Sequence, residues 1–186
     1  MRSAVSMGLT VCLLLTSPAV WAQNATGSEY HAKARFLAFF PSFIEWPGGA
    51  LPSGRAPLRL CIFGAFSFGS SLSEEIGARA FSSRPVEIRL VHKEQELPAC
   101  HILFVSRTEA KRYGEILAAV RGASVLTVGE TPDFLANGGA ISFLVQEESL
   151  RFDVNLPAAE EAHLKISSRL LALARHVITK AEAAKG

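Results

Sequence analysis

Beyond residue 57 the sequence alternates short apolar runs with segments of helical spacing, and this alternation restricts the chain to few architectures. Strands separated by helices form right-handed βαβ units, which build a mostly parallel sheet. The last two runs instead flank a short polar turn at 146–149, which is typical of an antiparallel hairpin. We therefore predict an α/β domain with a mostly parallel sheet flanked by helices and a C-terminal antiparallel hairpin. The predicted strands are 58–63, 86–91, 101–105, 124–128, 140–145 and 150–155.

Helical patterns account for most of the remaining sequence. The first lies at 29–40, where Ser28 can cap the N-terminus and Pro41 stops or kinks the helix. The apolar pattern nevertheless continues to Trp46. A chain of 186 residues is long enough for one domain with one real core. The other predicted helices are 67–76, 108–120, 131–136, 157–162 and 167–178.

The first 22 residues have the three parts of a secretory signal peptide. Arg2 supplies the positive start, an apolar stretch runs to about Leu15, and the run that ends at Ala22 has small residues at the spacing that a signal peptidase reads. The apolar stretch is shorter than the roughly 20 residues of a membrane span, which disfavours the alternative of a membrane anchor. We therefore expect a periplasmic protein with a signal peptide at 1–22, a flexible lead-in at 23–28 and one domain at 29–180.

Export to the periplasm would decide the oxidation state of the cysteines. Cys12 leaves with the signal peptide, and Cys61 and Cys100 remain in an oxidising compartment, where two cysteines suggest one disulfide. Two buried free thiols are the alternative. A metal site is disfavoured because neither cysteine has a second cysteine or a histidine at ligand spacing, apart from the adjacent His101. We expect neither a metal nor another cofactor.

The sequence contains no recognisable catalytic constellation. G-x-S-x-G and H-E-x-x-H are absent, and the glycine-rich turn at 64–69 lacks both G-x-G-x-x-G and Gly-Lys-Ser/Thr. A formal net charge of +2 argues against nucleic-acid binding. We therefore expect a binding protein and no enzyme. Two rival hypotheses are a periplasmic small-ligand carrier or sensor that uses the turn at 64–69, and a thiol-dependent enzyme at Cys61. The turn can also be a tight connection with an aromatic plug.

Two segments carry the residues best suited to bind a partner protein. The segment 36–46 concentrates aromatic side chains, which dominate interface energy where they are exposed and otherwise serve the core. The segment 152–169 combines a strand of alternating polarity with serines that can cap the last helix, and a capped helix packed on an edge strand is the alternative. The candidate partner-binding residues are Phe36, Phe40, Phe43, Trp46, Phe152, Asn155, Lys165, Ser167 and Arg169.

Several segments, in this order and spacing, resemble the YfiR-like family of periplasmic proteins over about Glu29 to Val177. No single segment is diagnostic, but their order and spacing together are fairly specific. The segments are Tyr30–Leu37, Phe43–Pro47, Leu58–Gly64, Cys100–Val105, Val125–Val128, Gly138–Ile141, Arg151–Asn155 and Leu164–Leu171.

This resemblance implies a Rossmann-like domain that acts as a repressor in cyclic-di-GMP signalling, and hence in biofilm control. The best-known member of the family binds the periplasmic sensor region of an inner-membrane diguanylate cyclase and holds it inactive. An outer-membrane-associated lipoprotein sequesters that repressor. Cys61 and Cys100 match one disulfide pair of the family, whereas a second pair is missing where Val145 and Phe152 fall. We expect the same class of partners here, and a homodimer.

Overall fold

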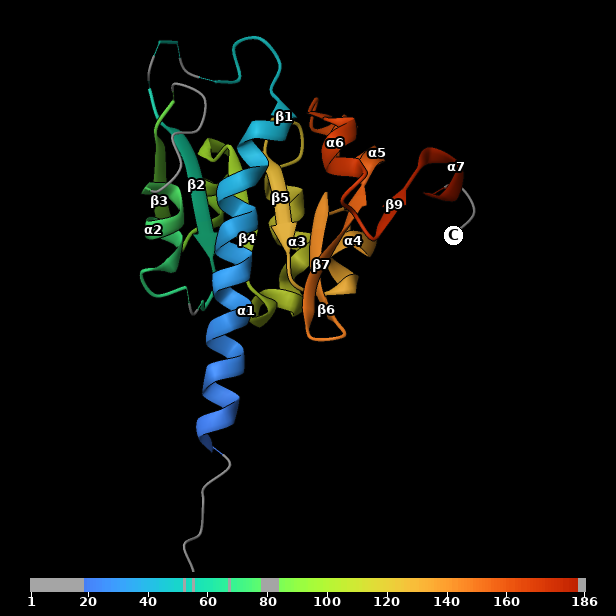
Figure 1. Cartoon of the computed structure of the whole chain (residues 1–186). Helices are drawn as coiled ribbons and strands as arrows, with labels where there is room; N and C mark the ends of the chain where they lie inside the picture. Colours follow the sequence, from blue (N-terminus) through green and yellow to red (C-terminus); the bar gives the residue numbers. More distant parts are fainter. Residues whose placement is uncertain (1–18, 52, 55, 67, 78–83, 184–186) are drawn as a thin grey trace, which may run out of the picture.

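A sheet of seven strands, in the order β3-β2-β4-β5-β6-β7-β9, runs through the middle of the protein (Figure 1). The computed structural model describes residues 19–51, 53–54, 56–66, 68–77 and 84–183. Neighbouring strands are parallel from β3 to β6, β7 is antiparallel to β6, and β9 is parallel to β7. The predicted fold class is confirmed. The strands are β2 Leu58–Phe63, β3 Val86–Val91, β4 Ile102–Val105, β5 Leu126–Gly129, β6 Ile141–Gln146, β7 Ser149–Asn155 and β9 His176–Ile178.

Helices cover both faces of this sheet (Figure 1). The long helix α1, Ala19–Phe39, crosses one face beside α2, Ser71–Gly77, and the 3₁₀ turn η1, Phe40–Phe43, follows α1 directly. The helices α3, Tyr113–Ala119, and α4, Pro132–Ala136, lie behind the sheet in this view. The remaining elements are η2 Glu94–Ala99, η3 Arg107–Arg112, α5 Leu156–Glu161, α6 Ser168–Leu171, α7 Lys180–Ala183, and a separate two-stranded sheet of β1 Ile44–Glu45 and β8 Lys165–Ile166.

Alternation along the strands divides the buried apolar side chains into two clusters, one on each face of the sheet. In β2, Leu58, Leu60 and Ile62 belong to the larger cluster under α1, whereas Cys61 and Phe63 belong to the cluster under α3. Burial on both faces explains why β2 and β4 read as nearly continuous apolar runs. The sheet therefore has a hydrophobic core on each face, and the helices on each side pack against that core.

The start of α1 differs from the prediction. Residues 23–28, for which the composition predicts a flexible lead-in, are helical in the structure. A helix that is already nucleated by packing extends at little cost through residues such as Ala25, which explains the longer helix. The end agrees with the expected effect of Pro41, because α1 stops at Phe39 and Pro41 lies in the first turn of η1. Of the predicted signal peptide, residues 1–18 lie outside the described part of the chain.

The predicted helix at 167–178 is wrong. The structure has only the short helix α6 there, followed by the strand β9. Val177 and Ile178 are β-branched and pair with β7, and the backbone N–H of Arg175 donates to the carbonyl of Phe152 at 2.9 Å. The Arg175 guanidinium also forms an ion pair with Asp153 on β7. Pairing with the sheet edge thus overrides the helical spacing of the apolar residues.

Candidate functional site

The two predicted contact segments meet in the structure. The strand β1 pairs antiparallel with β8, so that Glu45 lies opposite Lys165. The backbone N–H of Ser167 extends this pairing by donating a 2.9 Å hydrogen bond to the carbonyl of Phe43. In Figure 1 this small sheet lies at the end of α1, beside α6. We define the β1–β8 surface as exposed Glu45, Lys165, Ser168 and Arg169 with half-buried Phe43 and Ser167.

The aromatic candidates contribute more to the core than to this surface. Phe40 and Phe152 are 0% and 1% exposed, and their ring centroids are 5.6 Å apart. Half-buried Phe36 joins them, with centroid distances of 5.4 Å to Phe152 and 5.9 Å to Phe143. Phe40 and Phe152 are thus buried in the core and are not accessible to a partner. For Phe40 the structure matches the core alternative, and Phe152 packs beside it in the same core.

Three further candidates have structural roles that their surroundings explain. The indole N–H of half-buried Trp46, the residue after β1, donates to the carbonyl of Ser124, two residues before β5, at 3.1 Å. Asn155 caps α5 because its Oδ1 accepts from the N–H of Ala158 at 3.2 Å. Ser167 caps α6 in the same way. The capped-helix alternative therefore describes Ser167, whereas the cap that Asn155 provides to α5 was not predicted.

Lys165 and Arg169 are the candidates that remain available to a partner. Both side chains are exposed, and across the described ranges no carboxylate lies within ion-pair distance of either cation. Glu45 supplies a single negative charge on the neighbouring strand. The β1–β8 surface is therefore a small basic patch beside a half-buried aromatic ring, Phe43, which is suited to an acidic surface on another protein.

A buried charged cluster at the carboxyl ends of the strands was not predicted. Lys33 on α1 is 1% exposed and forms ion pairs with Glu29 and with Glu130, whose side chain is fully buried. The backbone N–H of Arg107 donates to Glu130 at 2.9 Å, and the Tyr30 hydroxyl donates to it at 3.4 Å. The position of Lys33 could have indicated a buried charge, because Lys33 lies three residues after Tyr30 and four before Leu37 and so shares their helical face.

The charges in this cluster shift the pKa values of its members. Burial, together with the negative charge of Glu130, raises the pKa of Tyr30 to about 12. Burial alone would raise the pKa of Glu29, but a hydrogen bond from Lys33 and the charges of Lys33 and Arg107 lower it below its usual value. Each charge is thus paired, and the cluster fastens α1 to the ends of β4 and β5.

The turn at 64–69 lies where open α/β sheets bind ligands, at the carboxyl ends of the strands where the strand order reverses. Here Phe68, 3% exposed, fills the place and makes edge-to-face contacts of 5.1 Å with Tyr30 and with Phe104. The backbone N–H of Ala65 donates to Thr108 Oγ1 at 3.1 Å and ties the turn to η3, which follows β4. The structure has a tight turn with an aromatic plug at this place.

Cys61 and Cys100 form a disulfide, with 5.9 Å between the Cα atoms. The bond joins β2 to Cys100, the C-cap of η2 two residues before β4, and both cysteines are almost fully buried. This confirms the expected pairing over the alternative of free thiols. In the disulfide form Cys61 has no thiolate, so it cannot act as a nucleophile.

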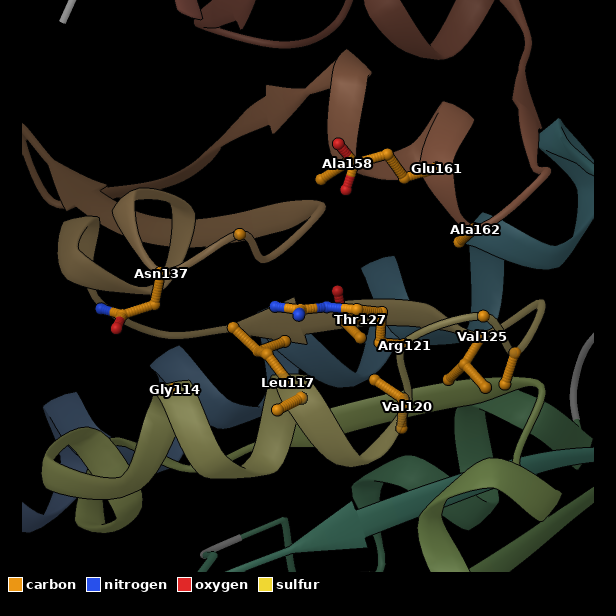
Figure 2. A pocket seen from close by; sticks show the side chains of 14 residues that line it. Gly114, Leu117, Val120, Arg121, Val125, Thr127, Asn137, Ala158, Glu161 and Ala162 are labelled. Carbon is orange, nitrogen blue, oxygen red and sulfur yellow. The ribbon is translucent and has the colours of Figure 1, made fainter.

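A small pocket lies between α3, the turn after α4, and α5 (Figure 2). Half of its lining residues are glycine or alanine, and Thr127, Arg121 and Glu161 are among the others. The volume is about 110 Å³, well below the roughly 300 Å³ at which sites for organic ligands begin. We therefore do not assign a ligand to it. Within the described residues, no helix has the length and apolar character needed to cross a membrane.

Two solved structures have a similar fold and little sequence in common with this chain. A conserved domain protein from Vibrio cholerae O1 biovar El Tor has a TM-score of 0.51 at 11% identity, over 69% of this chain and 56% of its own. The ABC domain of Streptococcus pneumonia, in complex with L-Trp, has a TM-score of 0.52 at 12% identity, over 78% of this chain and 60% of its own. The alignments cover less than two thirds of either structure, and at this identity they show the fold alone.

A family model provides the stronger comparison. The model described as YfiR/HmsC-like matches residues 30–175, which include the β1–β8 surface, the disulfide and most of the buried charged cluster. The match agrees with the resemblance seen in the sequence segments, and it covers well over half of the chain. The chain therefore belongs to the YfiR/HmsC-like family.

Proposed function

We propose that this chain binds the periplasmic sensor region of an inner-membrane diguanylate cyclase through the β1–β8 surface and represses cyclic-di-GMP synthesis. The family is one of periplasmic regulators of cyclic-di-GMP signalling, with a regulatory and not a catalytic role, which supports this class of function. The observation that carries the proposal is the exposure of Lys165 and Arg169, without ion-pair partners in the described part of the chain, on a surface built from two distant segments.

Repression requires only differential binding. A repressor that binds the inactive conformation of the sensor more tightly than the active one shifts the cyclase towards inactivity. Moving the population from almost fully active to almost fully inactive takes about 5.5 kcal/mol of differential affinity. The β1–β8 surface is suited to this because β1 and η1 are fixed to the core through Phe40, so little order has to be gained on binding.

Charge reversal on this surface tests the proposal. The chain and a diguanylate cyclase with a periplasmic sensor region, taken from the same genome, are produced together, and complex formation and cellular cyclic-di-GMP are measured. We expect the double variant Lys165→Glu/Arg169→Glu to weaken the complex about tenfold and to raise cyclic-di-GMP. The control is Arg151→Glu, which reverses an exposed charge on β7 outside the surface.

The outcomes separate the surface from the function. A complex that survives the double variant and fails with Arg151→Glu would move the interface to the hairpin. Failure of the unaltered chain to bind or repress any such cyclase of its genome would overturn the proposed function itself. Folding of each variant is checked by its thermal unfolding midpoint, so that a loss of binding is not confused with a loss of structure.

We propose, as further parts of this function, that residues 1–22 are a signal peptide removed on export to the periplasm, that the domain forms a homodimer, and that an outer-membrane lipoprotein competes with the cyclase. N-terminal sequencing of the periplasmic protein should give Gln23 as the first residue. Sedimentation of the purified protein should give twice the monomer mass. A monomer at micromolar concentration, or an unprocessed chain in the cytosol, would contradict these expectations.

A further inference from the structure

A second cavity, away from the β1–β8 surface, lies beside the disulfide at the β3 edge of the sheet. Its volume is about 480 Å³, within the range of sites that bind small organic molecules. The cavity belongs to the face of the sheet that carries α3, since Cys61 lies in the cluster on that face. Its lining residues are Arg59, Cys61, Arg89, Leu90, Val91, Glu96, Ala99 and Cys100.

Two arginines reach this cavity from neighbouring strands. Arg59 and Cys61 lie two residues apart on β2 and therefore project to the same face. Arg89 lies opposite Cys61 in the parallel register between β2 and β3. The lining thus joins two guanidinium groups with an apolar side formed by Val91, Ala99 and the disulfide.

Arg59 has a side-chain donor without a hydrogen-bond partner. Its Nε is, among the described residues, the one buried side-chain nitrogen or oxygen without a hydrogen-bond partner. A buried donor left without an acceptor loses its bonds to water and gains none in return, which is costly, and more so for a charged group. An anion in the cavity would bring an acceptor close to the Arg59 guanidinium, and the buried Nε could pair with it after a rotation of the side chain. This is an observation about the site itself, separate from its size and its charge.

The charges around the cavity favour an anion. Among the residues that line the cavity, Arg59 and Arg89 are opposed by Glu96 alone, which leaves one excess positive charge in the lining. The pKa of His101, whose Nδ1 accepts from the Arg59 backbone N–H at 2.8 Å, is lowered by burial and by the charges of Arg59 and Arg84. Glu87 pairs with Arg89 at 2.9 Å, but both side chains are well exposed. Such a pair is weak and can exchange for a ligand.

We propose that this cavity binds a small organic anion, with its carboxylate or phosphate group between Arg59 and Arg89 and its apolar part against Val91, Ala99 and the disulfide. Arg59 and Arg89 present planar forks of N–H donors, which match the oxygen atoms of carboxylate and phosphate groups. The ligand covers the buried disulfide, so its binding would also slow the reduction of that bond.

A panel of simple probes tests the proposal on the full-length mature protein. Benzoate and phenyl phosphate combine an anionic group with an apolar one, acetate and inorganic phosphate carry the charge alone, and benzamide is the neutral counterpart of benzoate. Binding is measured by isothermal titration calorimetry at constant ionic strength. We expect benzoate or phenyl phosphate to bind, the small anions to bind at least tenfold more weakly, and benzamide not to bind.

Variants locate the binding. Arg89→Gln, an exposed position that should fold normally, and Arg59→Gln should each weaken the anion about tenfold, the equivalent of one charge-assisted hydrogen bond. The control Arg121→Gln removes an exposed arginine that lies elsewhere, at the small pocket of Figure 2. Absence of binding by every anionic probe, or binding that Arg89→Gln leaves unchanged, would overturn the proposal. Neither result would bear on cyclase binding, which uses other residues.

Discussion

Lys33 and Glu130, 97 positions apart in the sequence, form an ion pair in which both side chains are withdrawn from solvent. A buried pair of this kind is not in itself a source of net stability, because taking two charges out of water is costly. Removing one partner is nevertheless strongly unfavourable, since the other remains charged and buried. The pair therefore fixes where α1 packs on the sheet, and its loss should lower the stability of the whole fold.

The first prediction concerns this ion pair. Lys33→Met should lower the free energy of unfolding by about 3 kcal/mol, because Glu130 loses its buried counter-charge and keeps only the interactions with Arg107 and Tyr30. Urea denaturation followed by circular dichroism measures the change. Lys93→Met, at an exposed position, is the control and should change the free energy by less than about 0.5 kcal/mol. Equal midpoints for both variants would contradict the prediction.

The second prediction concerns alkaline pH. The chain has only Tyr30 and Tyr113, so Tyr113→Phe leaves one tyrosine whose ionisation is visible in ultraviolet absorbance. Because burial and Glu130 raise the pKa of Tyr30 to about 12, the native protein should show no phenolate at pH 10. The unfolded chain ionises near its ordinary pKa of 10.

The sign of the effect on stability follows from this difference. The native state holds the Tyr30 proton more tightly than the unfolded state, so this contribution is complete below pH 10 and is lost as the pH rises from 10 to about 12. Denaturant midpoints of Tyr113→Phe, measured across that interval, should fall more steeply than those of a variant that also carries Tyr30→Phe. A native phenolate titration centred near pH 10 would refute the raised pKa.

The third prediction concerns the disulfide. Cys61 and Cys100 are separated by 39 positions, and the chain-entropy model gives a crosslink of this span roughly 4 kcal/mol of stabilisation. Cys61→Ala with Cys100→Ala should lower the free energy of unfolding by about that amount, and dithiothreitol should then have no further effect on it. Unaltered protein that has been fully reduced is the matched comparison. A double variant as stable as the oxidised protein would argue against a structural role.

The fourth prediction concerns the packing of Phe134. A Cβ added to Gly129 or to Gly139 would lie 2.2 Å from an atom of the fully buried Phe134 ring, which is far too close. Gly129→Ala should therefore cost about 1–3 kcal/mol. Gly48→Ala, where a Cβ would meet nothing within 4 Å, is the control and should be close to neutral. If thermal unfolding midpoints fall equally in the two variants, close approach to Phe134 is not what restricts Gly129.

The strands were the most predictable part of this fold. The predicted bounds 58–63 and 86–91 coincide with β2 and β3, because alternation indicates a strand directly and a short apolar run between turn residues is too short for a helix. The family resemblance also pointed to Cys61 and Cys100, which the structure joins. The strand bounds could be predicted because they depend on local sequence pattern. The disulfide could be predicted because only two cysteines remain outside the predicted signal peptide.

The errors arose where distant contacts decide the structure. Val177 and Ile178 had helical spacing with the residues before them, yet pairing with β7 makes them a strand. Lys33 gave no sign that its partner would be Glu130, since only the folded sheet brings them together. Phe40 and Phe152 were candidates for binding a partner, but both are buried. Their burial depends on which helix face meets the hairpin, and single-sequence patterns do not show that.

The order in which the chain is made has a consequence for its folding. The first helix supplies Phe36 and Lys33, whose partners Phe152 and Glu130 come much later in the chain. A polypeptide that emerges N-terminus first, from a ribosome or through a membrane channel, cannot close its core until most of its length is out. The contacts that dock α1 on the sheet therefore cannot form until residues 130 and 152 have emerged.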